Sequence, residues 1–225
     1  MAAQCHLVVV ANGEMGHPER LLAVLEHADG VIAADGGADW LLAQRRPADV
    51  LVGDLDSISP QALAWLRERG CRIERHRPDK DETDTELALL EAVRLGARRI
   101  TLLGALGGRI DHEIANVLLL AMPALEGVEA AIYDGRSWLT LLTREGFVRG
   151  AVGDTVSLIP LGGDAEGIVT EGLQYPLRDE TLSFGPARGV SNVLTAPQAR
   201  ITLRRGRLLV VHTPQDALED VHGRS

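Results

Sequence analysis

Residues 50–57 read VLVGDLDS, a short run of apolar side chains that ends at a glycine and two aspartates. The same order, an apolar run closed by glycine, asparagine or aspartate, occurs in residues 7–13, 31–37 and 100–104. Continuous apolar runs of this length are typical of parallel strands that are covered on both faces. Helical patterns fill the intervals, over residues 18–27, 60–69, 85–95 and 112–120. Strands that alternate with helices predict an open, mostly parallel α/β sheet.

The pattern changes after about residue 134. Helical periodicity fades there, and short β-type segments follow one another, separated by turn residues such as Gly153-Asp154 and Arg205-Gly206. The segments are 138–142, 155–159, 167–170, 181–184, 200–203 and 208–212. This spacing is typical of an antiparallel β-sandwich. We therefore expect an α/β domain over residues 1–134 and a β-sandwich domain over residues 135–225.

Composition argues against several classes of protein. The chain has 225 residues and a formal net charge of −9, which gives no general attraction to nucleic acid. Cys5 and Cys71 are its only cysteines and lie far apart, so neither a thiolate zinc site nor a disulfide framework is indicated. The apolar run at residues 7–11 is too short for a membrane span or a signal-peptide core. We expect a cytoplasmic protein that acts on small molecules, with no nucleic-acid or membrane partner.

Three acidic segments, residues 53–57, 79–84 and 107–111, each lie where a strand gives way to a loop or helix. Ligands of open α/β sheets bind outside the carboxyl ends of the strands, where all three segments fall. Carboxylates gathered there repel one another, and Mg²⁺ is usually held by one or two carboxylates together with substrate phosphates. The three segments therefore predict a site for Mg²⁺ and a polyphosphate.

Asp54 and Asp56 are spaced so that, on an extended strand end, both carboxylates project to one side and can share a cation. The alternative is that Asp56 or Ser57 caps the helix entered at Pro60. Capping leaves Asp54 unexplained, so a metal role for at least one of the two aspartates is favoured.

Thr83 and Glu86 have the spacing of a capping box, which predicts that a helix begins at this point. A helix start presents unpaired N–H groups and the positive end of its dipole, both of which suit phosphate. Asp81, just outside that start, is placed to carry a metal that bridges to the same phosphate. Lys80 is the only lysine of the chain. It is either a point charge for a phosphate or a partner for the adjacent carboxylates.

The third acidic segment, GGRID, combines glycines that let a ligand approach the backbone with Arg109, a planar donor for phosphate. Asp111 is a candidate base or metal ligand, or alternatively the N-cap of the following helix. His112-Glu113 does not begin a zinc motif, because Asn116 stands where the second histidine is needed. The chain also lacks the P-loop and the dinucleotide-binding fingerprint.

Taken together, these segments resemble the thiamin pyrophosphokinase family, whose enzymes transfer a diphosphoryl group from ATP to the hydroxyethyl oxygen of thiamin. The matching stretches run in family order over nearly the whole chain, and their joint order is highly specific. They are residues 34–39, 53–57, 79–86, 104–112, 157–161, 170–177 and 189–192.

The resemblance implies that the α/β domain is catalytic and binds ATP and Mg²⁺, and that the β-sandwich binds thiamin. It also implies a homodimer whose sites combine the α/β domain of one subunit with the sandwich of the other. The implied Mg²⁺ ligands are Asp54, Asp56 and Asp81, and the implied catalytic set adds Arg109 and Asp111. The implied nucleotide-binding residues are Asp35, Gly36, Gly37, Lys80, Thr83, Asp84 and Arg109. The implied thiamin pocket contains Tyr175, which stands where some relatives carry tryptophan, with Ser191 and Asn192.

The implied reaction is direct attack of the thiamin hydroxyl on the β-phosphorus of ATP, which releases AMP. Asp111 or a metal-linked carboxylate would assist removal of the proton. Two alternatives stay open at this point. One is another Mg²⁺-dependent enzyme on a similar sheet, such as a phosphatase or a different nucleotide transferase. The other is a non-catalytic thiamin or nucleotide sensor that keeps the pocket.

Overall fold

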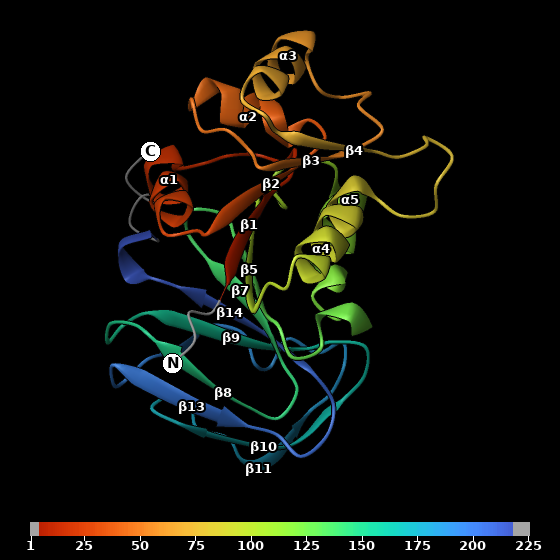
Figure 1. The fold of residues 1–225 in the computed structure, drawn as a ribbon. Helices are drawn as coiled ribbons and strands as arrows, with labels where there is room; N and C mark the ends of the chain where they lie inside the picture. The colour runs from red at the N-terminus through yellow and green to blue at the C-terminus, as the bar shows by residue number, and fades with distance from the viewer. Residues whose placement is uncertain (1–4, 218–225) are drawn as a thin grey trace. The chain divides into compact units, whose positions relative to one another are not determined.

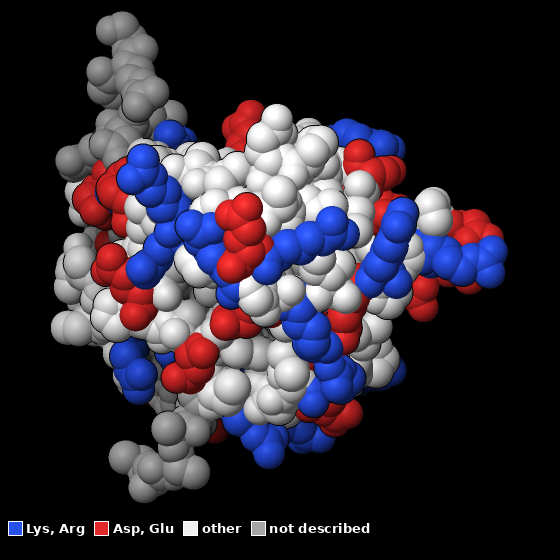
Figure 2. All heavy atoms as spheres, turned by 45° about the horizontal axis from the view of Figure 1, so that its top comes forward, with Lys and Arg blue, Asp and Glu red and all other residues white. Residues whose placement is uncertain are grey.

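The computed structural model describes residues 5–217, and Figure 1 shows the path of the chain. Contacts divide the chain into two compact units, Met1–Gly135 and Arg136–Ser225. Among residues 5–217 there is no helix with the length and apolarity that a membrane crossing requires. On the face shown in Figure 2, basic and acidic side chains lie interspersed and form no large patch of one sign.

The first unit is a sheet of six parallel strands in the order β6-β5-β1-β2-β3-β4. The strands are β1 (His6–Val10), β2 (Gly30–Ala34), β3 (Val50–Gly53), β4 (Arg72–Arg75), β5 (Arg99–Leu103) and β6 (Glu129–Tyr133). The connecting helices are α1 (Pro18–Glu26), α2 (Gly37–Ala43), α3 (Pro60–Glu68), α4 (Asp84–Arg94), α5 (Ile110–Leu119) and a 3-10 turn, η1 (Pro123–Leu125). The expected α/β class is confirmed. The pattern did not identify α2, β4 or β6, which are short.

Burial follows the apolar runs. Val8, Val9 and Val10 of β1 are 0% exposed, as continuous apolar strands covered on both faces require. In Figure 1, α1 lies on one face of the sheet and α4 with α5 on the other. The edge strand β4 is half exposed, and its Arg72 forms an ion pair with the buried Glu91 of α4. This ion pair fixes the edge of the sheet to the helix whose first residue is Asp84.

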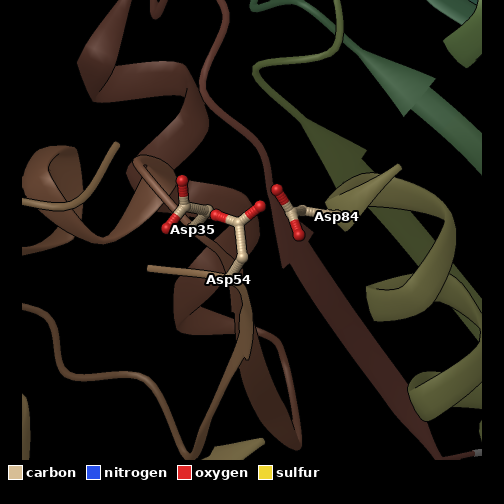
Figure 3. Close-up of side chains that lie close together, drawn as sticks. All are labelled: Asp35, Asp54 and Asp84. Carbon is tan, nitrogen blue, oxygen red and sulfur yellow. The ribbon is translucent and has the colours of Figure 1, made fainter. Parts of the chain in front are cut away.

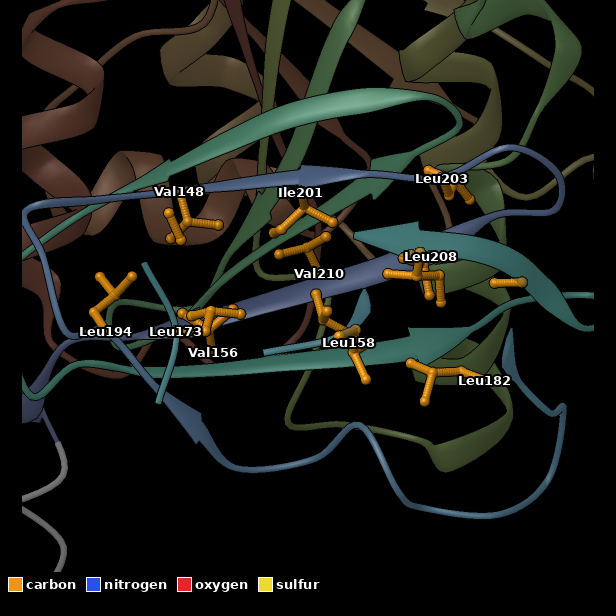
Figure 4. Packing of buried hydrophobic residues seen from close by; sticks show 14 residues of the cluster. Val148, Val156, Leu158, Leu173, Leu182, Leu194, Ile201, Leu203, Leu208 and Val210 are labelled. Carbon is orange, nitrogen blue, oxygen red and sulfur yellow. The ribbon is translucent and has the colours of Figure 1, made fainter. Parts of the chain in front are cut away.

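The second unit contains two antiparallel sheets, β12-β9-β14-β7 and β11-β10-β13-β8. Its strands are β7 (Trp138–Leu142), β8 (Glu145–Arg149), β9 (Thr155–Pro160), β10 (Ala165–Glu171), β11 (Arg178–Leu182), β12 (Asn192–Val193), β13 (Gln198–Thr202) and β14 (Leu208–Thr213). Figure 4 shows side chains of both sheets in one apolar cluster, for example Leu158 of β9 and Ile201 of β13. The expected β-sandwich is therefore confirmed.

A buried acid also organises the sandwich. Asp154 is 3% exposed. Its Oδ2 accepts hydrogen bonds from His212 Nε2 at 2.9 Å and from the Ala151 N–H at 2.9 Å, and its Oδ1 accepts one from the Gln215 N–H at 3.0 Å. Burial raises the pKa of the carboxyl, but these hydrogen bonds outweigh it and hold the pKa of Asp154 below its usual value. The carboxylate form is therefore part of the fold.

We expect Asp154→Asn to lower the free energy of unfolding by about 2 to 3 kcal/mol at neutral pH, because an amide cannot accept all three hydrogen bonds. A depressed pKa contributes stability above the unfolded value, and that stability is lost as the pH falls through the folded pKa. The difference between the wild type and the variant should therefore shrink in acid. Urea unfolding across pH measures it, with Asp179→Asn, an exposed partner of Arg204, as control. Equal losses in the two variants would contradict this role.

Candidate active site

A cavity of about 530 Å³ lies at the carboxyl ends of the parallel strands of the first unit. Its walls come from residues 11–13 after β1, 34–36 at the end of β2, Asp54 and Ser57 after β3, and the loop after β5. The segment before α4, the start of α4 and one side of α5 complete them, and that segment contributes Pro78, Lys80 and Glu82. The strand order turns back between β1 and β5, and ligands of open α/β sheets bind at such a switch point. The volume suits a small-molecule ligand.

Three carboxylates converge at this cavity. Oxygen atoms of Asp35, Asp54 and Asp84 all lie within 4.8 Å of one another. Figure 3 shows the three side chains close together, each on a separate element. Asp35 follows β2, Asp54 follows β3, and Asp84 is the first residue of α4. Parallel strands that end at one edge of the sheet bring these residues together although they are distant in the sequence.

Asp35 is the most buried of the three, with 4% of its surface exposed. Its Oδ2 accepts a hydrogen bond from the Ser57 N–H at 3.0 Å, and Oδ1 has no hydrogen-bond partner among the residues that the structure describes. Burial raises the pKa of this carboxyl more than the Ser57 hydrogen bond lowers it, and the charges of Asp84 and Asp56 raise it further. A buried oxygen without a partner, on a carboxylate that lies close to two others, is a ready ligand for a hard cation.

Asp54 is held by its own turn. Its Oδ1 accepts a hydrogen bond from the Asp56 N–H at 3.1 Å, and its Oδ2 lies 3.5 Å from Lys80 Nζ. Burial raises the pKa of Asp54, but the Asp56 hydrogen bond and the charge of Lys80 outweigh it, so the pKa lies below its usual value. Asp54 is therefore charged at neutral pH and offers oxygen to the cavity. The donor set of Asp35, Asp54 and Asp84 fits Mg²⁺.

Helix α4 begins as the capping box predicts. Thr83 is the N-cap, and its Oγ1 accepts a hydrogen bond from the Glu86 N–H at 3.1 Å. Thr83, Asp84 and Thr85 line the cavity, so the positive end of this helix faces it. An anion beside the acidic group would meet the N–H groups of this first turn.

The loop after β5 is held by α5. Asn116, which is buried, donates a hydrogen bond from Nδ2 to the Ala105 carbonyl at 2.8 Å. The Gly108 N–H donates to Glu113 Oε1 at 2.8 Å. Arg109 follows this loop and lines the cavity. Asn116 and Glu113 belong to no recognisable sequence motif. Their place on the helix that follows the predicted glycine loop is the only signal that points to them.

Arg109 and Asp111 pair with each other. The Arg109 guanidinium contacts the two Asp111 oxygens at 2.6 and 3.2 Å, and both side chains are exposed. The hydrogen bonds from Arg109 hold the pKa of Asp111 below its usual value. The alternative predictions, that Asp111 caps the helix after the glycine loop and that Asp56 or Ser57 caps the helix entered at Pro60, are both wrong. Helix α5 begins at Ile110, ahead of Asp111, and Ser59 rather than Asp56 or Ser57 caps α3.

The other predicted residues of the first unit lie around this core. Asp56 and Asp81 are exposed, and in the described part of the chain neither belongs to the group of three. Gly36 lines the cavity, whereas Gly37 begins α2 and packs against the backbone of β1. Residues 12 and 13 also line the cavity and were missed. Their position after the first apolar run was the available signal.

The three residues expected to contact thiamin lie together in the second unit. Asn192 is buried, accepts a hydrogen bond from the Tyr175 N–H at 3.0 Å and donates one to the Tyr175 carbonyl at 2.8 Å. Ser191 adopts a positive φ of 60° and donates its N–H to Ser157 Oγ at 3.0 Å. Tyr175 is 63% exposed. Asn192 therefore fixes the backbone that carries an exposed aromatic ring.

Comparisons with known proteins agree with one another. Residues 21–132 match the family model "Thiamin pyrophosphokinase, catalytic domain", and residues 145–208 match "Thiamin pyrophosphokinase, vitamin B1 binding domain". Thiamine pyrophosphokinase 1 of Oryza sativa subsp. japonica is 28% identical, over 89% of this chain and 84% of that protein. Thiamine pyrophosphokinase of Bacillus subtilis is 24% identical, over 72% of this chain and 76% of that protein.

Solved structures show the likeness of fold. The crystal structure of thiamine pyrophosphokinase from Bacillus subtilis gives a TM-score of 0.83 at 23% identity, and covers 93% of this chain and 99% of that chain. The yeast thiamin pyrophosphokinase gives 0.81 at 17% identity, and covers 98% of this chain and 90% of that one. Because the two family models together span most of the sequence, in order, the chain belongs to the thiamin pyrophosphokinase family.

Proposed function

We propose that this protein transfers the diphosphoryl group of ATP to the hydroxyethyl oxygen of thiamin, which gives thiamin diphosphate and AMP. One observation carries the proposal. Asp35, Asp54 and Asp84 converge beside the start of α4, inside the segment that matches the family's catalytic domain. This is an arrangement for a cation and a polyphosphate together.

The proposal includes Mg²⁺. Asp35, Asp54 and Asp84 would hold it, because their oxygens are close together and one of these oxygens has no hydrogen-bond partner within residues 5–217. When bound, the ion would neutralise charge on the transferred group and orient it. Asp56 and Asp81 remain proposed ligands of the metal–nucleotide complex, since both are exposed and each is adjacent to a residue that lines the cavity, Ser57 and Lys80 respectively.

The chain's own residues would position the reactants. The N–H groups in the first turn of α4 and the guanidinium of Arg109 would bind phosphate oxygens. The backbone at Asp35, Gly36 and Gly37 would support the nucleotide. Transfer of this kind depends mainly on positioning and on neutralisation of charge, which these groups provide without a covalent intermediate on the enzyme.

Asp111 is the proposed proton acceptor, and its geometry sets a condition. While Arg109 is bound to it, its pKa is low and it is a weak base. If Arg109 turned to a phosphate, the Asp111 carboxylate would be released beside the reacting group. Binding of ATP would then prepare the base for the thiamin hydroxyl.

Thiamin binding is proposed for the second unit, at Tyr175, Ser191 and Asn192. The exposed ring of Tyr175 offers a face for the cationic thiazolium, and the net charge of −9 attracts a cation. A homodimer is part of the proposal. Helix α5 exposes Ile110, Ile114 and Leu118 at intervals of four residues, and a second copy of the chain would bury such a stripe.

Incubation with ATP, Mg²⁺ and thiamin, followed by identification of the products, tests the function. We expect thiamin diphosphate and AMP in equal amounts. ADP or inorganic phosphate as product would instead favour another transferase or a phosphatase. Binding of both ligands without turnover would favour the sensor.

A further inference from the structure

Lys80, the only lysine in the chain, lies inside the acidic group. Its side chain is 12% exposed. The ammonium nitrogen lies 2.6 Å from Asp84 Oδ1 and 3.5 Å from Asp54 Oδ2. The basic side chains elsewhere in the chain are arginines. A compact ammonium therefore stands at the point where two of the three converging carboxylates meet.

The charges of the group are only partly balanced. Three carboxylates lie within 4.8 Å of one another, and Lys80 supplies one positive charge on the side of Asp54 and Asp84. The third member, Asp35, is 4% exposed, and its Oδ1 has no hydrogen-bond partner among the described residues. The site therefore keeps an excess of negative charge and an unpartnered oxygen, both of which favour binding of a further cation.

Lys80 and a divalent cation need the same oxygens. An ion coordinated by Asp54 and Asp84 would compete with an ammonium that is hydrogen-bonded to Asp84 and close to Asp54. Lys80 precedes α4, in the segment that follows β4, and its charge sits on a flexible four-carbon stem. It can leave the carboxylates for a phosphate oxygen, because lysine binds phosphate as a point charge.

We propose that Lys80 is an internal counter-ion, which competes with divalent cations for Asp54 and Asp84 and keeps the metal affinity of the nucleotide-free site low. It turns to the polyphosphate when nucleotide arrives, so that metal and nucleotide load together. This inference rests on the proposed function, because it assumes that the site binds a divalent cation and ATP. It makes Lys80 a positioning residue, whose effect is visible in metal binding without any substrate.

The test is a titration of the nucleotide-free protein with Mn²⁺ alone, followed by electron paramagnetic resonance or calorimetry. Lys80→Gln should bind Mn²⁺ about tenfold more tightly than the wild type, because the competing charge is gone. Lys80→Arg keeps the charge and should bind as weakly as the wild type. Arg77→Gln is the matched control, since Arg77 lies three residues away, is 84% exposed and pairs with the exposed Asp79. It removes the same charge and should change the affinity less than about twofold.

Lys80→Gln binding no more tightly than Arg77→Gln would overturn the proposal. If Lys80→Gln unfolds without metal, thermal unfolding against Mn²⁺ replaces the titration. The melting temperature of the variant should then rise at a lower Mn²⁺ concentration than that of the wild type. A variant that Mn²⁺ does not stabilise would overturn the proposal. The two hypotheses fail separately. Tighter Mn²⁺ binding in a protein that forms no thiamin diphosphate would reject the proposed function alone, whereas unchanged binding in an active enzyme would reject the counter-ion alone.

Discussion

Asp54→Asn is expected to lower kcat/KM for thiamin diphosphate formation about a thousandfold. The carboxylate belongs to the group of three and also accepts the Asp56 N–H that shapes its own turn. Asparagine keeps the size and one acceptor oxygen but removes the charge that a cation requires. The loss should appear mainly in kcat and in the Mg²⁺ concentration needed for half-maximal rate. Steady-state kinetics across Mg²⁺ concentrations measures both.

Asp56→Asn is the matched control for this prediction. Asp56 is exposed, lies outside the group of three and accepts a hydrogen bond from the Ser57 hydroxyl at 2.8 Å. We expect a smaller loss, of about tenfold, because Asp56 would contribute one ligand to the loaded complex but does not belong to the convergent group. Circular dichroism and thermal unfolding should show both variants folded. Losses of equal size at the two positions would contradict the convergent group and favour the set of Asp54, Asp56 and Asp81.

The strands were predictable because their signal is local. Continuous apolar runs such as residues 7–10 and 50–52 have few uses in a chain of this composition other than buried parallel strands. The start of α4 was predictable for the same reason, since Thr83 and Glu86 carry a capping pattern that needs no tertiary partner. The edge strand β4 was missed because it is half exposed and reads RIER, with a single apolar side chain.

The composition of the acidic group was less predictable because it depends on tertiary structure. The spacing of Asp54 and Asp56 predicts that the two carboxylates share a cation, but only if the backbone between them is extended. In the structure β3 ends at Gly53 and Leu55 has a φ of 71°, so the chain turns and the alternation of an extended strand is lost. Asp35 and Asp84 meet Asp54 only because β2 lies beside β3 and α4 begins at the same edge. No spacing within a single segment encodes that meeting.

Gly37→Ala is expected to lower the free energy of unfolding by about 3 kcal/mol. A Cβ at this position would lie 2.1 Å from the Val10 carbonyl oxygen and 2.9 Å from that of Ala11. Both are backbone atoms at the end of the buried strand β1, so relief requires that α2 or the strand move. Asp35 stands two residues earlier, so the shift would also displace the acidic group. Urea unfolding and steady-state kinetics should therefore both register the substitution.

Two other glycines, Gly16 and Gly36, separate this packing effect from a general cost of adding a methyl group. At Gly16 a Cβ would meet nothing within 4 Å and the φ is not positive, so Gly16→Ala should leave stability within about 0.5 kcal/mol. At Gly36 the Cβ would meet the Asn12 side chain at 2.4 Å, and a side chain can move where backbone cannot. We expect Gly36→Ala to fall between the other two in stability while altering the cavity wall directly. If Gly37→Ala were as stable as Gly16→Ala, the close packing of α2 on β1 would not be what selects glycine there.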